Sequence, residues 1–167
     1  INVEAGNPYY KSIGGVLYRC ETWDEVGDRL RLEVIPSAIK TFTIPRNCEE
    51  IENPEYYNLR HCTNLAAINV EAGNPRYKSI DGVLYTCHDY GEGGQWLYLA
   101  AVPPAIKTLT LPKNFSGMDE FFMLSACTNL TAINVEDGHP CYKSIDGVLY
   151  SFEFDVSDLR LEVIPAK

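Results

Sequence analysis

Apolar and polar residues alternate in short runs along this chain, and the same runs return at intervals. In residues 30–34, Leu and Val alternate with Arg and Glu, a period of two that predicts a β-strand with one buried face. Residues 81–85 and 97–102 form a second pair of strand-like runs on either side of a Gly-rich connector. The connectors vary in content and length between copies, so we expect β-hairpins with exposed tips.

The chain consists of three copies of one long unit. INVEAGNPYYKSIGGVLY begins at Ile1, INVEAGNPRYKSIDGVLY at Ile68 and INVEDGHPCYKSIDGVLY at Ile133, so the copies start 67 and 65 residues apart. The likeness continues through LRLEVIPSAIKTFTIP and LYLAAVPPAIKTLTLP, and the third copy stops at LRLEVIPAK. We therefore expect one repeat domain over residues 1–167, with units 1–67, 68–132 and 133–167, the last of them truncated.

Each long unit contains two shorter motifs of the type apolar-x-x-apolar-x-apolar. They begin at Ile39, Leu65, Ile106 and Leu130, which are 26, 41 and 24 residues apart. A leucine-rich coil takes about 20–29 residues, so the long spacing fits one coil plus an insertion of roughly 15 residues. This spacing predicts stacked coils in which each coil covers the apolar edge of the next.

Turn and helix signals complete the predicted fold. Asn7-Pro8, Asn74-Pro75 and His139-Pro140 direct the chain from a strand into the hairpin, because the residue before proline avoids the helical region. Residues 49–62 and 116–127 are the best candidates for short helical turns. We predict a strand-dominated α/β solenoid of the leucine-rich-repeat type. It is a right-handed coil with a parallel sheet of about five short strands, short outer helices and three inserted β-hairpins.

The motif set C-T-N-L-T-x-I-x-V, N-P-x-Y-x-S-I-D-G-V-L-Y and I-x-T-x-T-[IL]-P resembles that of BspA-like leucine-rich repeats and covers essentially the whole chain. The resemblance implies an arc of short parallel strands backed by short helices. It also implies a bacterial protein, at the cell surface or secreted, that adheres to host matrix proteins, other cells or glycans. The shared motif residues are structural, so the resemblance assigns no binding residue.

Composition narrows the classes of partner. The 167 residues are 46% hydrophobic, which is enough for a sizeable core, and the formal net charge is -9. An acidic surface repels phosphate backbones, so we expect no nucleic-acid partner. No apolar run approaches the roughly 18 residues that span a bilayer, so we expect no membrane span. Both ends fall inside a repeat, and we expect part of a longer array or end-to-end self-association.

Six cysteines raise the alternatives of disulfides and metal ligands, and the repeat alignment argues against both. Cys48 corresponds to Phe115, and a position that accepts either residue is an apolar packing site. The equivalent Cys62 and Cys127 lie two coils apart, about 10 Å at the spacing of parallel strands and beyond disulfide reach. We expect no metal site and no cofactor, and we expect an exposed thiol at Cys141.

No set of unlike polar residues predicts catalysis. Asp81 and Asp146 are equivalent carboxylates, but Gly14 replaces them in the first copy, and an Asp-Gly turn between two strands accounts for both. His88 falls in a variable connector and is interpreted as a solvated loop residue. We expect no enzyme, and a glycan-processing enzyme is the least favoured alternative because the sequence offers no carboxylate pair.

Two surfaces of the predicted fold are candidates for binding a partner. The outward positions of the short strands are small and polar, and they either pair along the sheet or form an extended docking face. Aromatic residues in the connectors either contact a sugar or a protein, or pack along their own hairpins. The strand-face candidates are Asn2, Thr43, Asn69, Thr110 and Asn134, and the connector candidates are Trp23, Tyr90, Trp96 and Phe154.

The function expected from these features is binding without catalysis. We expect a surface or secreted module that recognises a protein or glycan ligand, such as host matrix or another cell surface. A purely structural spacer in a larger surface protein is the alternative, because recurring polar residues serve stacking equally well.

Overall fold

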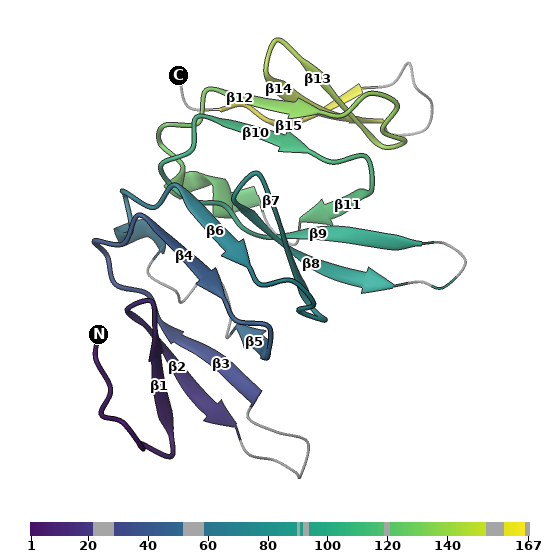
Figure 1. Ribbon diagram of the computed structural model, residues 1–167. Coiled ribbons are helices and arrows are strands. Elements are labelled where there is room, and N and C mark those ends of the chain that lie inside the picture. Colours follow the sequence, from purple (N-terminus) through teal and green to yellow (C-terminus); the bar gives the residue numbers. More distant parts are fainter. Residues whose placement is uncertain are drawn as a thin grey trace.

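The computed structural model describes residues 1–21, 29–51, 59–89, 91, 94–118, 121–152 and 159–165. These residues form many short strands, shown in Figure 1, and no helix among them is long and apolar enough to cross a membrane. In chain order the elements are β1 (Tyr10–Ile13), β2 (Val16–Glu21), β3 (Arg29–Val34), β4 (Thr41–Ile44), β5 (Cys48–Ile51), η1 (Leu59–His61), β6 (Ala67–Val70), β7 (Tyr77–Ile80), β8 (Val83–Asp89), β9 (Gln95–Ala101), β10 (Thr108–Leu111), β11 (Phe115–Met118), η3 (Phe121–Ala126), β12 (Ala132–Val135), β13 (Tyr142–Ile145), β14 (Val148–Phe152) and β15 (Leu159–Val163).

Each copy contributes an antiparallel meander of three strands. The strand orders are β1-β2-β3, β7-β8-β9 and β13-β14-β15. The alternating residues 30–34 lie in β3, and the run 97–102 begins in β9, so the predicted hairpin strands are confirmed. The first strand of each meander, which carries the sequence YKSI, is an addition that the hydrophobic pattern did not predict.

A two-residue turn joins the first two strands of each meander. Asp81 and Gly82 have φ angles of 51° and 78°, and the pairs at 14–15 and 146–147 are also positive at both positions. Two consecutive positive φ values define a type I′ turn, whose twist matches that of the flanking strands and which favours Asp-Gly. The expected Asp-Gly turn is therefore confirmed, and the role of Asp81 in it is conformational.

Parallel pairing joins successive coils in two separate ladders. β4 pairs with β6, and β10 pairs with β12, as Figure 1 shows. The prediction of one parallel sheet of about five strands is wrong, because among the described residues the two ladders do not join. In addition, β5 pairs in parallel with β3 and β11 with β9, which extends the first two meanders to four strands.

The hairpins of the second and third copies each close one edge of the short strand that precedes them. The Ile68 N–H donates to the Gly82 carbonyl at 2.8 Å, and Ser79 Oγ donates to the Ile68 carbonyl at 2.7 Å. Ile133 makes the same two contacts with its own hairpin. Because these polar groups are already satisfied, β6 offers no edge at this point to β10, and the sheet stops.

The segments expected to be helical begin as strands instead. β5 and β11 cover residues 48–51 and 115–118, so the helical prediction is wrong at the start of both segments. Pairing with the edges of β3 and β9 satisfies backbone groups that a helix would otherwise satisfy internally. Further along, the described residues form two short 3-10 helices, η1 and η3, and no α-helix.

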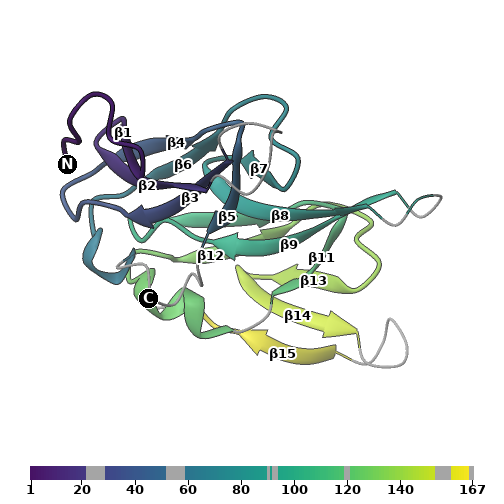
Figure 2. The ribbon, with the colours of Figure 1, turned by 90° about the horizontal axis from the view of Figure 1, so that it is seen from below.

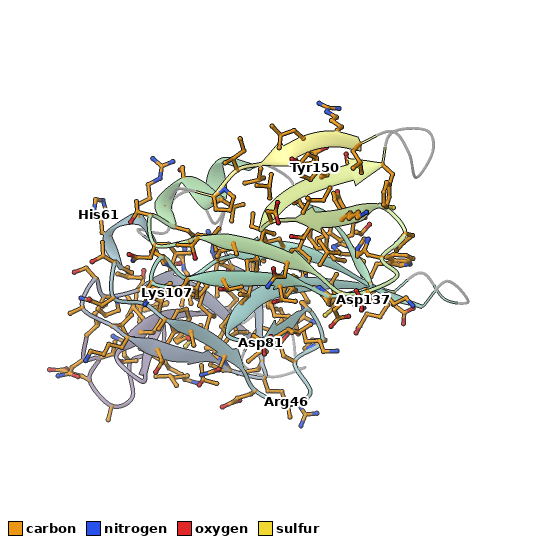
Figure 3. The ribbon with its side chains drawn as sticks, turned by 90° about the horizontal axis from the view of Figure 1, so that it is seen from above. Arg46, His61, Asp81, Lys107, Asp137 and Tyr150 are labelled. Atoms are coloured by element: carbon orange, nitrogen blue, oxygen red, sulfur yellow. The ribbon has the colours of Figure 1, made fainter. Side chains whose placement is uncertain are left out.

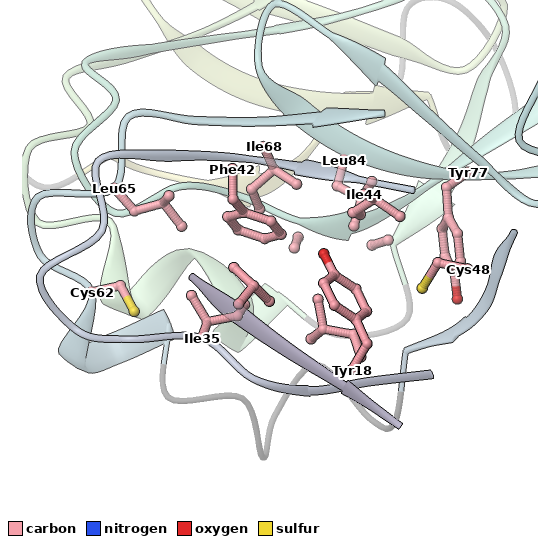
Figure 4. Packing of buried hydrophobic residues seen from close by; sticks show 14 of the residues in the cluster. Tyr18, Ile35, Phe42, Ile44, Cys48, Cys62, Leu65, Ile68, Tyr77 and Leu84 are labelled. Atoms are coloured by element: carbon pink, nitrogen blue, oxygen red, sulfur yellow. The ribbon is translucent and has the colours of Figure 1, made fainter. Parts of the chain in front are cut away.

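The core consists of two apolar clusters among the described residues, and each cluster spans two copies. In the first cluster, Phe42 of β4 and Ile68 of β6 pack with Tyr18 of β2, as Figure 4 shows, and Leu84 joins them from the second hairpin. Residues from two copies thus bury one another, which agrees with a repeat solenoid.

Candidate partner-binding surface

The strand-face candidates do not form one continuous stripe. Thr43 lies opposite Asn69 in the first ladder, and Thr110 lies opposite Asn134 in the second. Thr110 is half-buried and the others are exposed, while Asn2 is exposed and precedes the first strand. The structure therefore brings these residues together as two pairs, because the hairpins separate the ladders.

Of the connector candidates, Trp96 alone lies among the described residues; Trp23, Tyr90 and Phe154 lie outside them. Trp96 is a strand residue of β9, half-buried, and it lies opposite His88 of β8. The interpretation of His88 as a loop residue is wrong.

Among the described residues, one face of the β8–β9 hairpin is aromatic and carries no Asp, Glu, Lys or Arg. Strand alternation places Thr86 and His88 of β8 on this face, opposite Tyr98 and Trp96 of β9. The rings of His88 and Tyr98 meet edge to face with their centroids 4.9 Å apart. Leu97, between the two aromatic residues, is buried on the other side. We call Thr86, His88, Trp96 and Tyr98 the aromatic face.

The equivalent faces of the other two hairpins carry charged side chains. In β2–β3, Glu21 lies opposite Arg29 and forms an ion pair with Arg31 at 3.7 Å. In β14–β15, Ser151 donates a hydrogen bond of 2.6 Å to Glu162. The hairpins share a backbone pattern, so stacking does not dictate these side chains, and the second copy is distinguished by its aromatic rings.

The β8–β9 hairpin also extends furthest from the body of the molecule. Its two strands are seven residues long each, against six for β2 and β3. Figures 1 and 2 show it projecting past the ladders. The register places the pairs Thr86–Tyr98 and His88–Trp96 towards its outer half. His88 is exposed on this projecting element, while Thr86, Trp96 and Tyr98 are half-buried, so the aromatic face is accessible in part to a large partner.

The cysteines are free thiols, as the repeat alignment predicted. Cys48, Cys62 and Cys127 are buried, Cys141 is exposed, and Phe115 is as deeply buried as its counterpart Cys48. Burial raises the pKa of Cys48 to about 12 and that of Cys127 to about 11. These two thiols stay protonated at neutral pH and are therefore poor nucleophiles.

The described residues show no candidate metal site. No group of three or more His, Cys, Asp or Glu side chains that could hold a metal ion occurs in the described part of the chain. Figure 3 shows the labelled Arg46, His61, Asp81, Lys107 and Asp137 at separate places on the surface. Catalysis needs unlike groups in one pocket, and these five side chains do not gather in one.

The Asn-Pro turns connect neighbouring coils. Asn74 Oδ1 accepts hydrogen bonds from the N–H groups of Arg76 and Tyr77, at 2.9 and 2.8 Å. Its Nδ2 group donates to the carbonyls of Pro45 and Cys48, both at 2.9 Å. One asparagine thus fixes the start of its own hairpin and holds the preceding coil, a role that sequence reasoning missed.

His139 replaces this asparagine in the third copy and makes equivalent contacts. Its Nδ1 accepts from the N–H groups of Cys141 and Tyr142 at 3.1 Å, and its Nε2 donates to the Phe115 carbonyl at 2.9 Å. The ring is therefore neutral, with its proton on Nε2. Burial lowers the pKa of His139 and opposes a second proton.

Comparison with known proteins gives structural neighbours only. No family model and no curated protein sequence matches the chain. The chain is similar to the pneumococcal vaccine antigen PcpA, with a TM-score of 0.43, 21% identity and coverage of 60% of this chain and 22% of that chain. A leucine-rich repeat protein from Eubacterium ventriosum matches with a TM-score of 0.33 and 18% identity, over 59% of this chain and 36% of that chain. A leucine rich cell surface protein from Faecalibacterium prausnitzii matches with a TM-score of 0.35 and 16% identity, over 57% of this chain and 29% of that chain.

The matches span between 22% and 36% of the length of those solved chains. Two of these neighbours are described as a leucine-rich repeat protein and a leucine rich cell surface protein.

Proposed function

We propose that this chain is a non-catalytic binding module of a cell-surface or secreted protein, and that the aromatic face contacts its partner. The contrast between equivalent hairpin faces carries the proposal. The first face is ionic and the third contains the Ser151–Glu162 hydrogen bond, whereas the second presents Trp96 and Tyr98. Residues that recur serve stacking, so residues that differ between copies on a partly exposed face are available for recognition.

The chemistry of the face supports a protein or glycan partner. Trp and Tyr bury a large area with little loss of conformational freedom and dominate binding hot spots. Thr86 and His88 add hydrogen-bonding groups beside the rings. A partner with a flat apolar patch bordered by polar groups, such as a sugar ring or an amphipathic protein surface, fits this arrangement.

A structural spacer is the second candidate function. It is favoured by the polar pairs Thr43–Asn69 and Thr110–Asn134, which lie in register within the ladders and resemble the cross-strand pairs that stabilise sheets. In that case the hairpin faces would be free to differ without consequence.

Binding of the intact chain to a glycan array and to a panel of matrix proteins tests the proposal. For any ligand bound, Trp96→Ala should weaken binding by about 2 kcal/mol or more, as expected of a hot-spot residue. Arg29→Ala, which changes the counterpart of Trp96 in the first hairpin, is the matched control and should leave binding unchanged. Equal affinity of Trp96→Ala and the unaltered chain would rule out the aromatic face, and absence of any ligand would favour the spacer.

A further inference from the structure

The uncharged character of the aromatic face continues onto a third strand. Gly117 of β11 lies opposite Tyr98 of β9, and Ser116 precedes it in the chain. A Cβ atom at Gly117 would lie 3.9 Å from Cε1 of Tyr98. Because glycine has no such atom, β11 leaves this flank of the Tyr98 ring uncovered.

The first copy carries charged residues at the equivalent positions. Glu50 lies opposite Arg31 there, as Gly117 lies opposite Tyr98. The difference extends over three strands, so it is not a single substitution. The first copy holds Arg19, Glu21, Arg29, Arg31, Glu33, Glu49 and Glu50, and the second holds Thr86, His88, Trp96, Tyr98, Ala100, Ser116 and Gly117.

The third copy keeps an ion pair that the second copy lacks. Arg160 and Glu162 occupy the positions of Tyr98 and Ala100, and Nε of the arginine lies 3.9 Å from Oε1 of the glutamate. The corresponding atoms of the Arg31–Glu33 pair in the first copy are also 3.9 Å apart. Copies that share one backbone pattern retain this pair, so stacking does not require its loss in the second copy.

The uncharged surface is small. We call Thr86, His88, Trp96, Tyr98, Ser116 and Gly117 the neutral platform. A stable protein–protein interface takes about 20–30 residues from each partner, and these six residues fall well short of that number. A ligand of one or two sugar rings matches the platform in size.

The side chains of the platform suit the two kinds of surface that a sugar ring presents. A pyranose ring has faces of apolar C–H groups and a rim of hydroxyl groups. Trp96 and Tyr98 lie two residues apart on one face of β9, and their rings can bury the C–H groups. His88 is exposed and Thr86 and Ser116 are half-buried, and all three carry groups that hydrogen-bond to hydroxyls.

Charge decides between neutral and acidic sugars. The platform contains no Lys or Arg, and the chain has a formal net charge of -9. A carboxylate or sulfate group on the ligand would find no cation on the platform and would be repelled by the protein as a whole. On the basis of the proposed function, in which the aromatic face contacts the partner, we propose that the platform binds an uncharged glycan. One hexopyranose ring lies over Gly117 against Tyr98, and the next lies on Trp96.

Chemical-shift titration of the intact, isotope-labelled chain tests this proposal. The uncharged probes are cellotriose, triacetylchitotriose and lactose, and the acidic probes are trigalacturonate and sialyllactose. We expect saturable shifts with at least one uncharged probe, in the Trp96 indole and in the amides of β8, β9 and β11. The acidic probes should bind at least about tenfold more weakly than that probe.

Substitution of Gly117 tests the position of the ring. Gly117→Glu introduces the residue of the first copy beside Tyr98, at a position without a positive φ, and should weaken binding at least about tenfold. Gly117→Ala adds only a methyl group and should weaken binding by less. Glu50→Gly makes the reverse change in the first copy, and as the matched control it should leave binding unchanged. Circular dichroism checks that the three variants keep the fold of the unaltered chain.

Three results would overturn the proposal. They are the absence of saturation with every uncharged probe up to about 10 mM, equal affinity for acidic and uncharged probes, or equal binding by Gly117→Glu and Glu50→Gly. A protein ligand that Trp96→Ala weakens, in a chain that binds no sugar, would refute the glycan and leave the proposed function standing. If Trp96→Ala weakens no ligand of either class, both proposals are wrong.

Discussion

Equivalent residues of the first and second copies lie in different surroundings although their sequences are nearly the same. Ile1 is 45% exposed, and Ile68 is 1% exposed. A Cβ at Gly15 would meet no atom within 4 Å, whereas one at Gly82 would lie 2.8 Å from the Cβ of Ala67. These positions are therefore buried only where a neighbouring coil covers them, and one copy does not bury them by itself.

The largest expected effect comes from the glycine of the hairpin turn. Gly82→Ala forces an L-residue into φ 78° and drives its Cβ against Ala67, so we expect a loss of about 3 kcal/mol in the free energy of unfolding. Gly15→Ala has a similar φ of 82° without the contact and should cost about 1 kcal/mol. Urea unfolding measures the free energy of unfolding of both variants. Equal losses in the two variants would show that the contact with Ala67 adds no cost.

The asparagine of the Asn-Pro turn gives the next largest effect. Asn74→Ala removes two accepted and two donated hydrogen bonds, so the free energy of unfolding should fall by about 2 kcal/mol. Asn7→Ala should cost about half as much, because the contacts described for its side chain are the two that it accepts. Asn74→His is the control, and it should lower the free energy of unfolding by less than Asn74→Ala does. A larger loss for Asn7→Ala would contradict the account.

Lowering the pH should destabilise the contact that His139 makes in the third copy. The pKa of His139 is lowered by burial, which the hydrogen bond to the Phe115 carbonyl and the charge of Glu136 oppose, so the unfolded chain takes up a proton at a higher pH than the folded chain. This contribution to stability is therefore complete above about pH 6.5, is lost progressively as the pH falls below that value, and the loss levels off below the folded pKa. His139→Asn introduces the residue of the second copy and should remove this loss of stability at low pH. The Tm of the unaltered chain and of the variant, measured between pH 7.5 and 5.5, tests this. Parallel curves of Tm against pH would show that His139 is not the cause.

The smallest effect concerns two equivalent tyrosines. Tyr18 Oη donates a long hydrogen bond of 3.4 Å to the Thr43 carbonyl, whereas Tyr85 Oη is buried without a partner in the described part of the chain. Tyr85→Phe should leave stability unchanged or raise it by up to about 1 kcal/mol, because a buried unpaired hydroxyl is costly. Tyr18→Phe should lower it by about 0.5 kcal/mol. Urea unfolding decides, and a marked loss for Tyr85→Phe would show that its hydroxyl has a partner.

The repeat and its turns could be predicted from the sequence because they depend on local requirements. A positive φ at two successive positions selects Asp-Gly, and this requirement is visible at Asp81 without any tertiary information. The extent of the sheet could not be predicted, since β6 is closed by the Ser79 hydroxyl and the Gly82 carbonyl, groups that no hydrophobic period reveals. Residues 48–51 are a strand because β3 offers them an edge.

The sequence pointed to some residues of the proposed aromatic face and not to others. Trp96 could be chosen from the sequence because it is an aromatic residue beside a variable connector, and residue type and position are enough to identify it. Tyr98 was missed because it falls in the run L-Y-L-A, where an aromatic residue reads as part of an apolar strand. Its position beside His88 depends on the cross-strand register, which the length of the hairpin loop sets.

Amide hydrogen exchange at three equivalent glutamates tests whether neighbouring coils protect one another. The amides of Glu71 and Glu136 donate to carbonyls of the preceding coil, and no such coil lies beside Glu4 among the described residues. The account predicts slow exchange at Glu71 and Glu136 and rapid exchange at Glu4. Exchange at Glu71 as rapid as at Glu4 would show that neighbouring coils do not protect one another, and would contradict it.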